Sequence, residues 1–104
     1  MYQEDGDPEA GYEYPTGIGR IDLLAKHRNE PRWLVVELKR NQSSDKTVGQ
    51  VLRYMGWVKK HLAADEETVE GLVISHSGDE QLDYALAPVP AVKAKRYRVQ
   101  FYLE

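Results

Sequence analysis

One helical stripe set among short strand-like segments constrains the fold of this 104-residue chain more than any other feature. From Val48 to Leu62, apolar residues recur every three or four positions, which is the period of an amphipathic helix. Residues 43–45 (Ser-Ser-Asp) are suited to cap a helix that begins near Lys46. The expected apolar stripe consists of Val48, Val51, Leu52, Met55, Val58 and Leu62.

Segments typical of β-strands lie on both sides of this helix. Residues 20–26 and 33–38 are rich in apolar and β-branched side chains, and the polar loop 27–32 between them predicts a hairpin. The remaining expected elements are a short strand at Tyr12–Tyr14, a buried strand at 69–75, a short helix at 78–87 with Leu82, Ala85 and Leu86 inward, and a half-exposed strand at 96–103. The order β-β-β-α-β-α-β predicts an α/β fold.

Length and composition restrict the organisation of the chain. The length suits one domain, which we expect to span residues 12–104 behind a flexible acidic segment at 1–11. Without cysteine, disulfides, thiolate zinc sites and cysteine nucleophiles are excluded. No apolar run approaches the ~18 residues of a membrane span, and the N-terminus is not a signal peptide. We therefore expect a cytoplasmic protein without a membrane partner.

The net charge of −3 does not exclude nucleic acid as a partner. Four negative residues and no positive ones lie within residues 1–9, so the rest of the chain carries 14 positive and 13 negative residues. A local basic run consists of Lys93, Lys95, Arg96 and Arg98. This run is suited to follow a DNA backbone or, alternatively, to solvate a strand edge.

The predicted hairpin brings two carboxylates together. If Lys26 opposes Trp33, an antiparallel register places Asp22 opposite Glu37, with Cβ atoms ~4.5–5.5 Å apart. A slip of one residue would move Asp22 to the other face of the sheet. Opposed like charges need compensation by a shared proton, by Lys39 on the same face, or by a bound cation.

This arrangement favours metal-dependent phosphodiester hydrolysis. A hard ion such as Mg²⁺ or Mn²⁺ would take Asp22 and Glu37, with a backbone carbonyl, that of Leu38, and waters. Lys39 would orient the attacking water or stabilise developing charge. Glu37-Leu38-Lys39 is the only Glu-x-Lys in the chain. The alternative is a strand-end ion pair whose charges point into water.

Three motifs carry a resemblance to a known family: Gly19–Leu24 (GRIDLL), Val35–Arg40 (VVELKR) and Val48–Trp57 (VGQVLRYMGW), preceded by Tyr14-Pro15-Thr16. The chain resembles the nuclease domain of NucS/EndoMS-type DNA endonucleases, of the PD-(D/E)xK superfamily. The resemblance implies a restriction-endonuclease-like core, with a mixed central β-sheet flanked by helices. Ile21 replaces the proline of the superfamily name, a substitution common in this family.

The resemblance also implies roles for individual residues. Asp22 and Glu37 would be metal ligands, Lys39 the water-orienting residue, and Gln50 a site residue reaching in from the following helix. Tyr54 lies one turn after Gln50 on the same helix face and would line the cleft or pack in the core. Arg20 and Arg40 flank the motifs and would contact phosphate or serve solubility. For Trp57 and the three histidines, we expect packing, surface or capping roles.

The family normally carries a helix ahead of this region, which supplies a further acidic residue, and a separate N-terminal domain. The resemblance therefore implies a truncated or minimal endonuclease acting on mismatch, flap or single-strand-type DNA. A homodimer is expected, because cutting a duplex needs two sites. The second hypothesis is a catalytically impaired nuclease-fold module that binds DNA or a partner and dimerises. The third is a small α/β interaction domain whose Asp22–Glu37–Lys39 set is a structural ion network.

Overall fold

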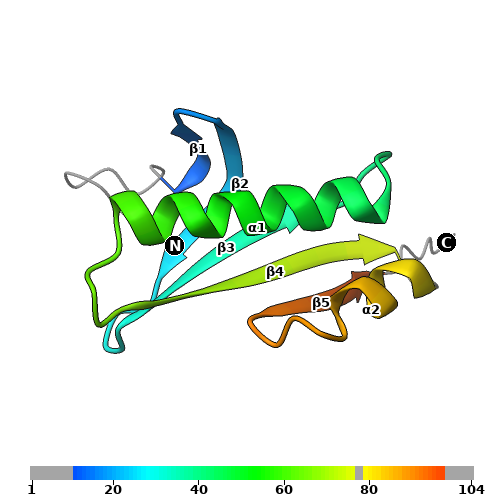
Figure 1. Ribbon diagram of the computed structural model, residues 1–104. Coiled ribbons are helices and arrows are strands. Elements are labelled where there is room, and N and C mark those ends of the chain that lie inside the picture. Colours follow the sequence, from blue (N-terminus) through cyan, green and yellow to red (C-terminus); the bar gives the residue numbers. More distant parts are fainter. Residues whose placement is uncertain (1–10, 77–78, 98–104) are drawn as a thin grey trace, which may run out of the picture.

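The computed structural model describes residues 11–76 and 79–97 of the chain (Figure 1). Within these residues the elements follow the expected order, β-β-β-α-β-α-β. Their bounds are β1 Tyr12–Thr16, β2 Gly19–Lys26, β3 Arg32–Leu38, α1 Ser44–His61, β4 Thr68–His76, α2 Glu80–Leu86 and β5 Val92–Tyr97. The flexible segment expected at 1–11 falls outside the described residues except for Gly11.

The strands form one mixed sheet in the order β1-β2-β3-β4-β5. The first three strands pair antiparallel through short connections, whereas β3–β4 and β4–β5 are parallel. Parallel neighbours need a crossover, and α1 and α2 supply the two crossovers. The predicted α/β fold with a mixed central sheet is confirmed.

The predicted register of the β2–β3 hairpin is confirmed over four residue pairs, from Lys26 opposite Trp33 to Leu23 opposite Val36. The regular alternation of β2 ends at this point. Ile21 and Leu24 are both fully buried in the same core, although residues three apart on a regular strand face opposite sides. Asp22 therefore lies where β2 changes its course.

Helix α1 is capped as expected, because the Ser43 side chain accepts a hydrogen bond from the Lys46 backbone N–H. Its buried stripe differs in one position from the predicted one. Leu52 is 41% exposed, and Tyr54 is buried instead. Tyr54 lies three residues after Val51 and four before Val58, so it continues their row on the helix.

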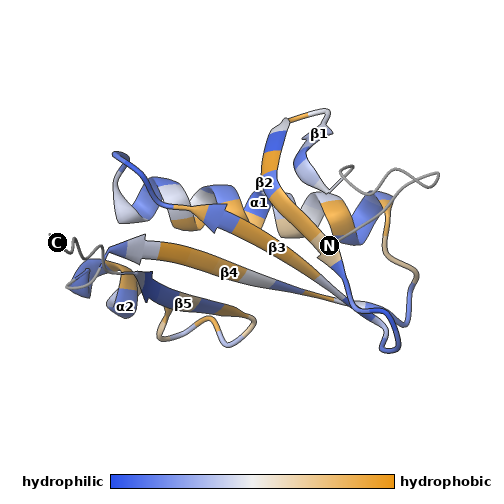
Figure 2. Cartoon of the chain, turned by 180° about the vertical axis from the view of Figure 1, so that it is seen from behind, coloured by the Kyte–Doolittle hydropathy of each residue, from blue (hydrophilic) through white to orange (hydrophobic). Residues whose placement is uncertain are grey.

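The core lies between α1 and one face of the sheet. Both helices cover this face, since α2 contacts α1 as well as β5. The buried apolar cluster consists of Tyr14, Ile21, Leu24, Trp33, Val35, Val51, Tyr54, Val58, Val73, Leu82, Leu86 and Val92. The view from behind, in which the sheet lies in front of α1, shows hydrophobic stretches along β3 and β4 (Figure 2). On the sheet face away from α1, Val36 is buried by its strand neighbours Leu23 and Leu72.

The last strand differs from its predicted bounds of 96–103. It begins at Val92, which is buried and pairs with Gly71 of β4. The weak β-propensity of the segment Lys93–Lys95 hid its start in the sequence, while residues 98–103 lie outside the described part. The other predicted elements are confirmed with small shifts of their ends. In the described ranges, 11–76 and 79–97, no helix combines the length and apolarity that crossing a membrane requires.

Candidate active site

Asp22 and Glu37 meet where β2 and β3 part. The Asp22 backbone N–H points at Glu37 Oε1 at 3.4 Å, and the Leu38 backbone N–H donates to Asp22 Oδ2 at 2.8 Å. Glu37 is 4% exposed, because its side chain faces α1 with those of Trp33 and Val35. The hairpin register thus brings the two predicted carboxylates together.

Burial dominates the electrostatics of this acidic pair. Desolvation, followed by the charge of Asp22, raises the pKa of Glu37 to about 7. The Asp22 backbone N–H and the Arg40 guanidinium act in the opposite direction and do not outweigh these effects. A proton on Glu37 or a cation between the carboxylates would relieve the repulsion.

Lys39 and Arg40, the two cations that follow Glu37 in the sequence, have different partners. The sequence pattern leaves Lys39 open as one of three possible compensations for the acidic pair, beside a shared proton and a bound cation. In the structure its ammonium lies 3.0 Å from Asp79 Oδ2. Arg40 is the cation beside the pair, with Nη1 at 3.6 Å from Asp22 Oδ1. Lys39 forms this ion pair because Asp79, at the start of α2, approaches the end of β3 from a distant part of the chain.

The pairing of Lys39 with Asp79 is the contact that sequence reasoning missed. Asp79 is the N-cap of α2, accepting a hydrogen bond from the Leu82 backbone N–H, and it also accepts one from the Ser44 hydroxyl. Burial acts to raise the pKa of Asp79, but hydrogen bonds from Lys39, Leu82 and Ser44 outweigh it and hold the pKa below its usual range. An aspartate just ahead of a short helix signals a cap in the sequence, but not its ionic partner.

Tyr54 and Gln50 lie on α1 above the sheet. Tyr54 is buried, and the pKa of its phenol is raised by burial first and then by the charges of Glu37 and Asp22. Tyr54 therefore packs in the core and also borders the acidic pair. Gln50 is half-buried one turn earlier, beside the same row of the helix.

The other predicted residues take several positions. Arg20 is exposed, and its guanidinium lies 4.0 Å from Glu13 rather than against the acidic pair. Trp57 packs against the core and meets the Tyr14 ring edge-on at 6.3 Å. In the basic run Lys93 and Lys95 are exposed, while Arg96 is tied to Asp83, and Arg98 lies outside the described residues.

The histidines take surface and capping positions, as expected. His27 Nδ1 accepts hydrogen bonds from the Asn29 and Glu30 backbone N–H groups and so closes the β2–β3 loop. The His61 ring stacks near Trp57, and the His76 ring lies against Tyr97. Both are exposed.

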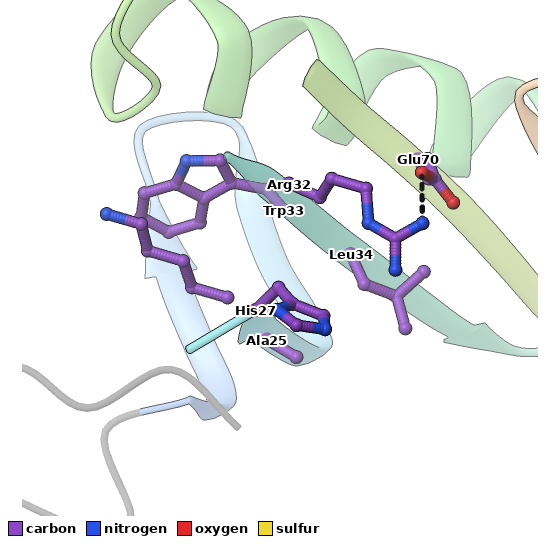
Figure 3. Close-up of a pocket in the computed structure, with 7 residues that line it drawn as sticks. Ala25, His27, Arg32, Trp33, Leu34 and Glu70 are labelled. Atoms are coloured by element: carbon purple, nitrogen blue, oxygen red, sulfur yellow. Dashed lines mark ion pairs between the residues drawn. The ribbon is translucent and has the colours of Figure 1, made fainter. Parts of the chain in front are cut away.

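A separate hollow of about 190 Å³ lies at the other end of the β2–β3 hairpin (Figure 3). Its walls include Ala25, His27 and Leu34, and an ion pair between Arg32 and Glu70 crosses it at 3.6 Å. None of the predicted site residues lines this hollow. The acidic pair is therefore separate from this hollow and lies at the opposite end of β3.

The donor set at the acidic pair fits a small hard cation. Asp22 and Glu37 offer carboxylate oxygens, and Mg²⁺ is usually bound by one or two carboxylates with several waters. The Leu38 N–H points toward Asp22, and the N–H and C=O of a strand residue point to the same side, so the Leu38 carbonyl also lies on the β2 side. Across the described ranges of the chain, no group of three or more acidic or histidine side chains offers a fuller protein ligand set.

Comparison with known families gives this geometry a context. Residues 4–87 match the family described as the endonuclease NucS C-terminal domain, which is most of the chain. The chain belongs to the NucS C-terminal domain family. The matched range includes both strands of the acidic pair, all of α1, and Asp79 with α2.

Two curated relatives of this NucS-type domain are nucleases by name. Endonuclease NucS of Methanocaldococcus jannaschii is 36% identical over 66 residues, which are 64% of this chain and 23% of that protein. The putative nuclease YhcG of Escherichia coli is 37% identical over 84 residues, which are 78% of this chain and 22% of that protein. The chain thus spans under a quarter of the length of either relative.

A solved structure shows a similar fold. The structure of an EndoMS-dsDNA2 complex superposes with a TM-score of 0.57 at 20% identity, covering 86% of this chain and 36% of that one. At this identity the likeness is one of fold alone. It agrees with the mixed sheet and its two crossover helices.

Proposed function

We propose that this domain is the catalytic part of a metal-dependent DNA endonuclease. The observation that carries the proposal is the contact between Asp22 and the buried Glu37 at the point where β2 and β3 part. A buried carboxylate beside a second carboxylate is costly for a fold unless a proton or cation joins them. Membership of a family named for an endonuclease supports the same conclusion.

In this proposal Asp22, Glu37 and the Leu38 carbonyl would hold Mg²⁺ or Mn²⁺. When bound, such an ion supplies an acidified water and neutralises charge on the phosphodiester. Glu37 holds a fixed position, because it is buried against α1. Asp22 is fixed by the Leu38 N–H, which leaves its other oxygen toward Arg40.

The remaining residues take supporting roles in the proposal. Lys39 follows Glu37 by two positions and would orient the attacking water or stabilise developing charge. Arg40 is placed to contact a phosphate, because it is 63% exposed beside Asp22. Gln50 would reach the site from α1, Tyr54 would border the substrate cleft, and Arg20 would contact phosphate farther away.

The proposed substrate is DNA with a mismatch, a flap or a single-stranded region. The similar EndoMS structure is a complex with double-stranded DNA, which supports the choice of DNA. Two cuts in a duplex need two sites, so we propose a homodimer. The proposed compartment is the cytoplasm, as an enzyme acting on DNA requires access to it.

Cleavage of labelled DNA with Mg²⁺ or Mn²⁺ tests this function. We expect the wild-type chain to cut, and Glu37→Ala and Lys39→Ala to lose the cut by at least ~100-fold, a loss typical of removing a metal ligand or charge-stabilising group. Glu70→Ala is a matched control, because Glu70 forms an exposed ion pair at the other end of the sheet. Cleavage that persists in both the Glu37→Ala and the Lys39→Ala variants would contradict the proposal.

A second candidate function is a nuclease-fold module that binds DNA or a partner without cutting. The observation that favours it is the ion pair of Lys39 with Asp79, since the charge of Lys39 is then engaged by a residue outside the acidic pair. DNA binding or dimerisation without metal-dependent cleavage by the wild-type chain would support this candidate.

Calorimetry separates both candidates from a purely structural ion network. Mn²⁺ binding that disappears in Asp22→Ala would exclude the third hypothesis, an interaction domain in which the charged set only stabilises the fold. Absence of Mn²⁺ binding by the wild-type chain would favour it.

A further inference from the structure

Asp79 joins four separate elements through one residue. Its Oδ1 accepts hydrogen bonds from the Leu82 backbone N–H at 3.2 Å and from the Ser44 hydroxyl at 3.1 Å. Its Oδ2 lies 3.0 Å from the Lys39 ammonium, and its backbone carbonyl accepts from Arg96 Nη2 at 3.1 Å. Asp79 thus contacts residues of four elements: the end of β3, the first turn of α1, the start of α2, and β5.

The two carboxylate oxygens of Asp79 have different tasks. Capping of α2 needs one acceptor for an N–H of the first turn, and Oδ1 provides it. The Ser44 hydroxyl shares that same oxygen. Oδ2 is the oxygen directed at Lys39, so the ion pair is an addition to the cap rather than part of it.

Lys39 needs such an anchor if it is to act at the acidic pair. A lysine side chain is long and has many rotamers, so an unanchored one is poorly positioned. Lys39 continues the pairing of β3, because its backbone N–H donates to the Ile74 carbonyl at 2.9 Å. Its side chain therefore shares a face with Glu37, with the two Cβ atoms ~7 Å apart along the strand.

The Lys39–Asp79 pair is sheltered from solvent. The side chains are 18% and 15% exposed, whereas the Arg20–Glu13 pair is 72% and 78% exposed. Partly buried charges are screened less than exposed ones, and a carboxylate fixed by two further donors holds its partner in one place.

We infer that Asp79 is a positioning residue of the nuclease site, which acts through Lys39 by anchoring its ammonium on the face of β3 that carries Glu37. The inference rests on the proposed function, since it names a residue that prepares the proposed site. Among the described residues, the side-chain contacts of Asp79 are with Lys39, Ser44 and Leu82 and not with the two carboxylates of the pair.

The test compares Asp79→Asn with Asp83→Asn in the full chain. Asparagine still caps a helix, so the first change removes the charge while keeping the α2 cap. Asp83 is the matched control, because it is an acidic residue of the same helix, it pairs with Arg96, and it is 62% exposed. Urea unfolding checks that each variant is folded, and Asp79→Ser, which also caps, replaces the asparagine variant if that one unfolds.

We expect Asp79→Asn to lower the single-turnover cleavage rate with saturating Mn²⁺ by ~10–100-fold, as the loss of an orienting partner does. DNA affinity, measured in Ca²⁺, and Mn²⁺ affinity stay within about twofold, since Asp79 contacts neither ligand. Asp83→Asn keeps the wild-type rate. In a Lys39→Ala background Asp79→Asn has no further effect, because its target is gone.

The outcomes separate the two proposals. A wild-type chain that does not cleave overturns the proposed function and this inference with it. A wild-type chain that cleaves while Asp79→Asn cleaves equally fast overturns the inference alone. The same holds if the losses from Asp79→Asn and Lys39→Ala multiply, since Asp79 would then act independently of Lys39.

Discussion

At the scale of single residues, Glu37 has the most perturbed environment of the site. Its carboxylate is buried against α1 and faces Asp22, and both conditions favour its protonated form. Trp33 and Val35 share its face, so the β3 alternation that builds the core also buries this acid. The burial was implicit in the strand pattern, but its extent depends on what α1 covers.

Glu37→Gln tests this burial through the pH dependence of stability. The pKa of Glu37 is raised from 4.5 to about 7, so the folded state holds the proton more tightly than the unfolded state. The contribution of this proton to the free energy of unfolding is fully present below about pH 4.5 and is lost as the pH rises through about 7. We expect the metal-free wild type to lose about 3 kcal/mol of unfolding free energy over this range relative to Glu37→Gln.

Urea unfolding with a chelator present, at steps between those two pH values, measures this difference. Titrating groups that do not interact with Glu37 contribute equally to both proteins and cancel. Parallel curves for the two proteins would show that Glu37 is not perturbed by burial.

Gly19 has a backbone conformation that favours glycine, and its neighbour Tyr54 leaves no room for a Cβ. Its φ is +135°, and an added Cβ would collide with the Tyr54 hydroxyl. We expect Gly19→Ala to lower the unfolding free energy by about 2 kcal/mol or more, from backbone strain and this clash. In a Tyr54→Phe background the loss becomes smaller but persists, because the backbone strain remains.

Thermal or urea unfolding measures both effects. Gly17→Ala in the same turn is the control, since nothing lies within 4 Å of its added Cβ. An equal loss for Gly17 and Gly19 would contradict the explanation.

At the scale of elements, the packing of α1 on β4 decides which helix residues are buried. Val51 and Met55 sit over Gly71, where the lack of a side chain lets the helix approach the strand. The apolar period alone predicts the helix and most of its stripe. It places Leu52 in the buried stripe where the structure has Tyr54, because the apolar period does not show which side of the stripe meets the sheet.

Two glycine substitutions should change the free energy of unfolding with opposite signs, one in this contact and one away from it. A Cβ on Gly71 would lie 2.7 Å from Met55 Sδ and 3.1 Å from Val51 Cγ2, so Gly71→Ala should cost about 1–3 kcal/mol by overpacking. Gly56→Ala meets nothing within 4 Å and should stabilise α1 by about 0.5–1 kcal/mol. Denaturant unfolding of the two variants checks the signs, and a neutral or stabilising Gly71→Ala would show that the side chains of Met55 and Val51 give way to the added Cβ.

At the scale of the whole molecule, Glu67 links segments that are distant in the sequence. Its Oε1 accepts hydrogen bonds from the Ala64 backbone N–H at 2.8 Å and the Trp33 indole N–H at 3.0 Å. Its Oε2 lies 3.3 Å from the Lys26 ammonium, which also lies over the Trp33 ring. The loop after α1 is thereby fastened to the β2–β3 hairpin.

This link predicts a loss of stability in acid. The Ala64 N–H first, then the Trp33 indole and Lys26, lower the pKa of Glu67 to about 2. Its contribution is therefore present above about pH 4.5 and is lost as the pH falls toward about 2. We expect Glu67→Gln to show a flatter acid limb than the wild type in urea unfolding, and Glu66→Gln, at the exposed neighbouring position, serves as the control.

The amino-acid pattern alone was enough to predict the element order, the α/β class and the meeting of Asp22 with Glu37. These follow from local period and from the register of one short hairpin, in which a few residues and a tight connection fix the pairing. Strand β5 was misplaced because Lys93 and Lys95 lie on an edge strand, where burial imposes little pattern.

The packing of whole elements decides three features that the sequence did not show. They are the ionic partner of Lys39, the extent of burial of Glu37, and the presence of Tyr54 rather than Leu52 in the core. Lys39 and Asp79 are joined because two parallel crossovers bring the end of β3, the start of α1 and the start of α2 together. No local pattern records such a meeting, since ionic and packing partners depend on how these elements lie against one another in space.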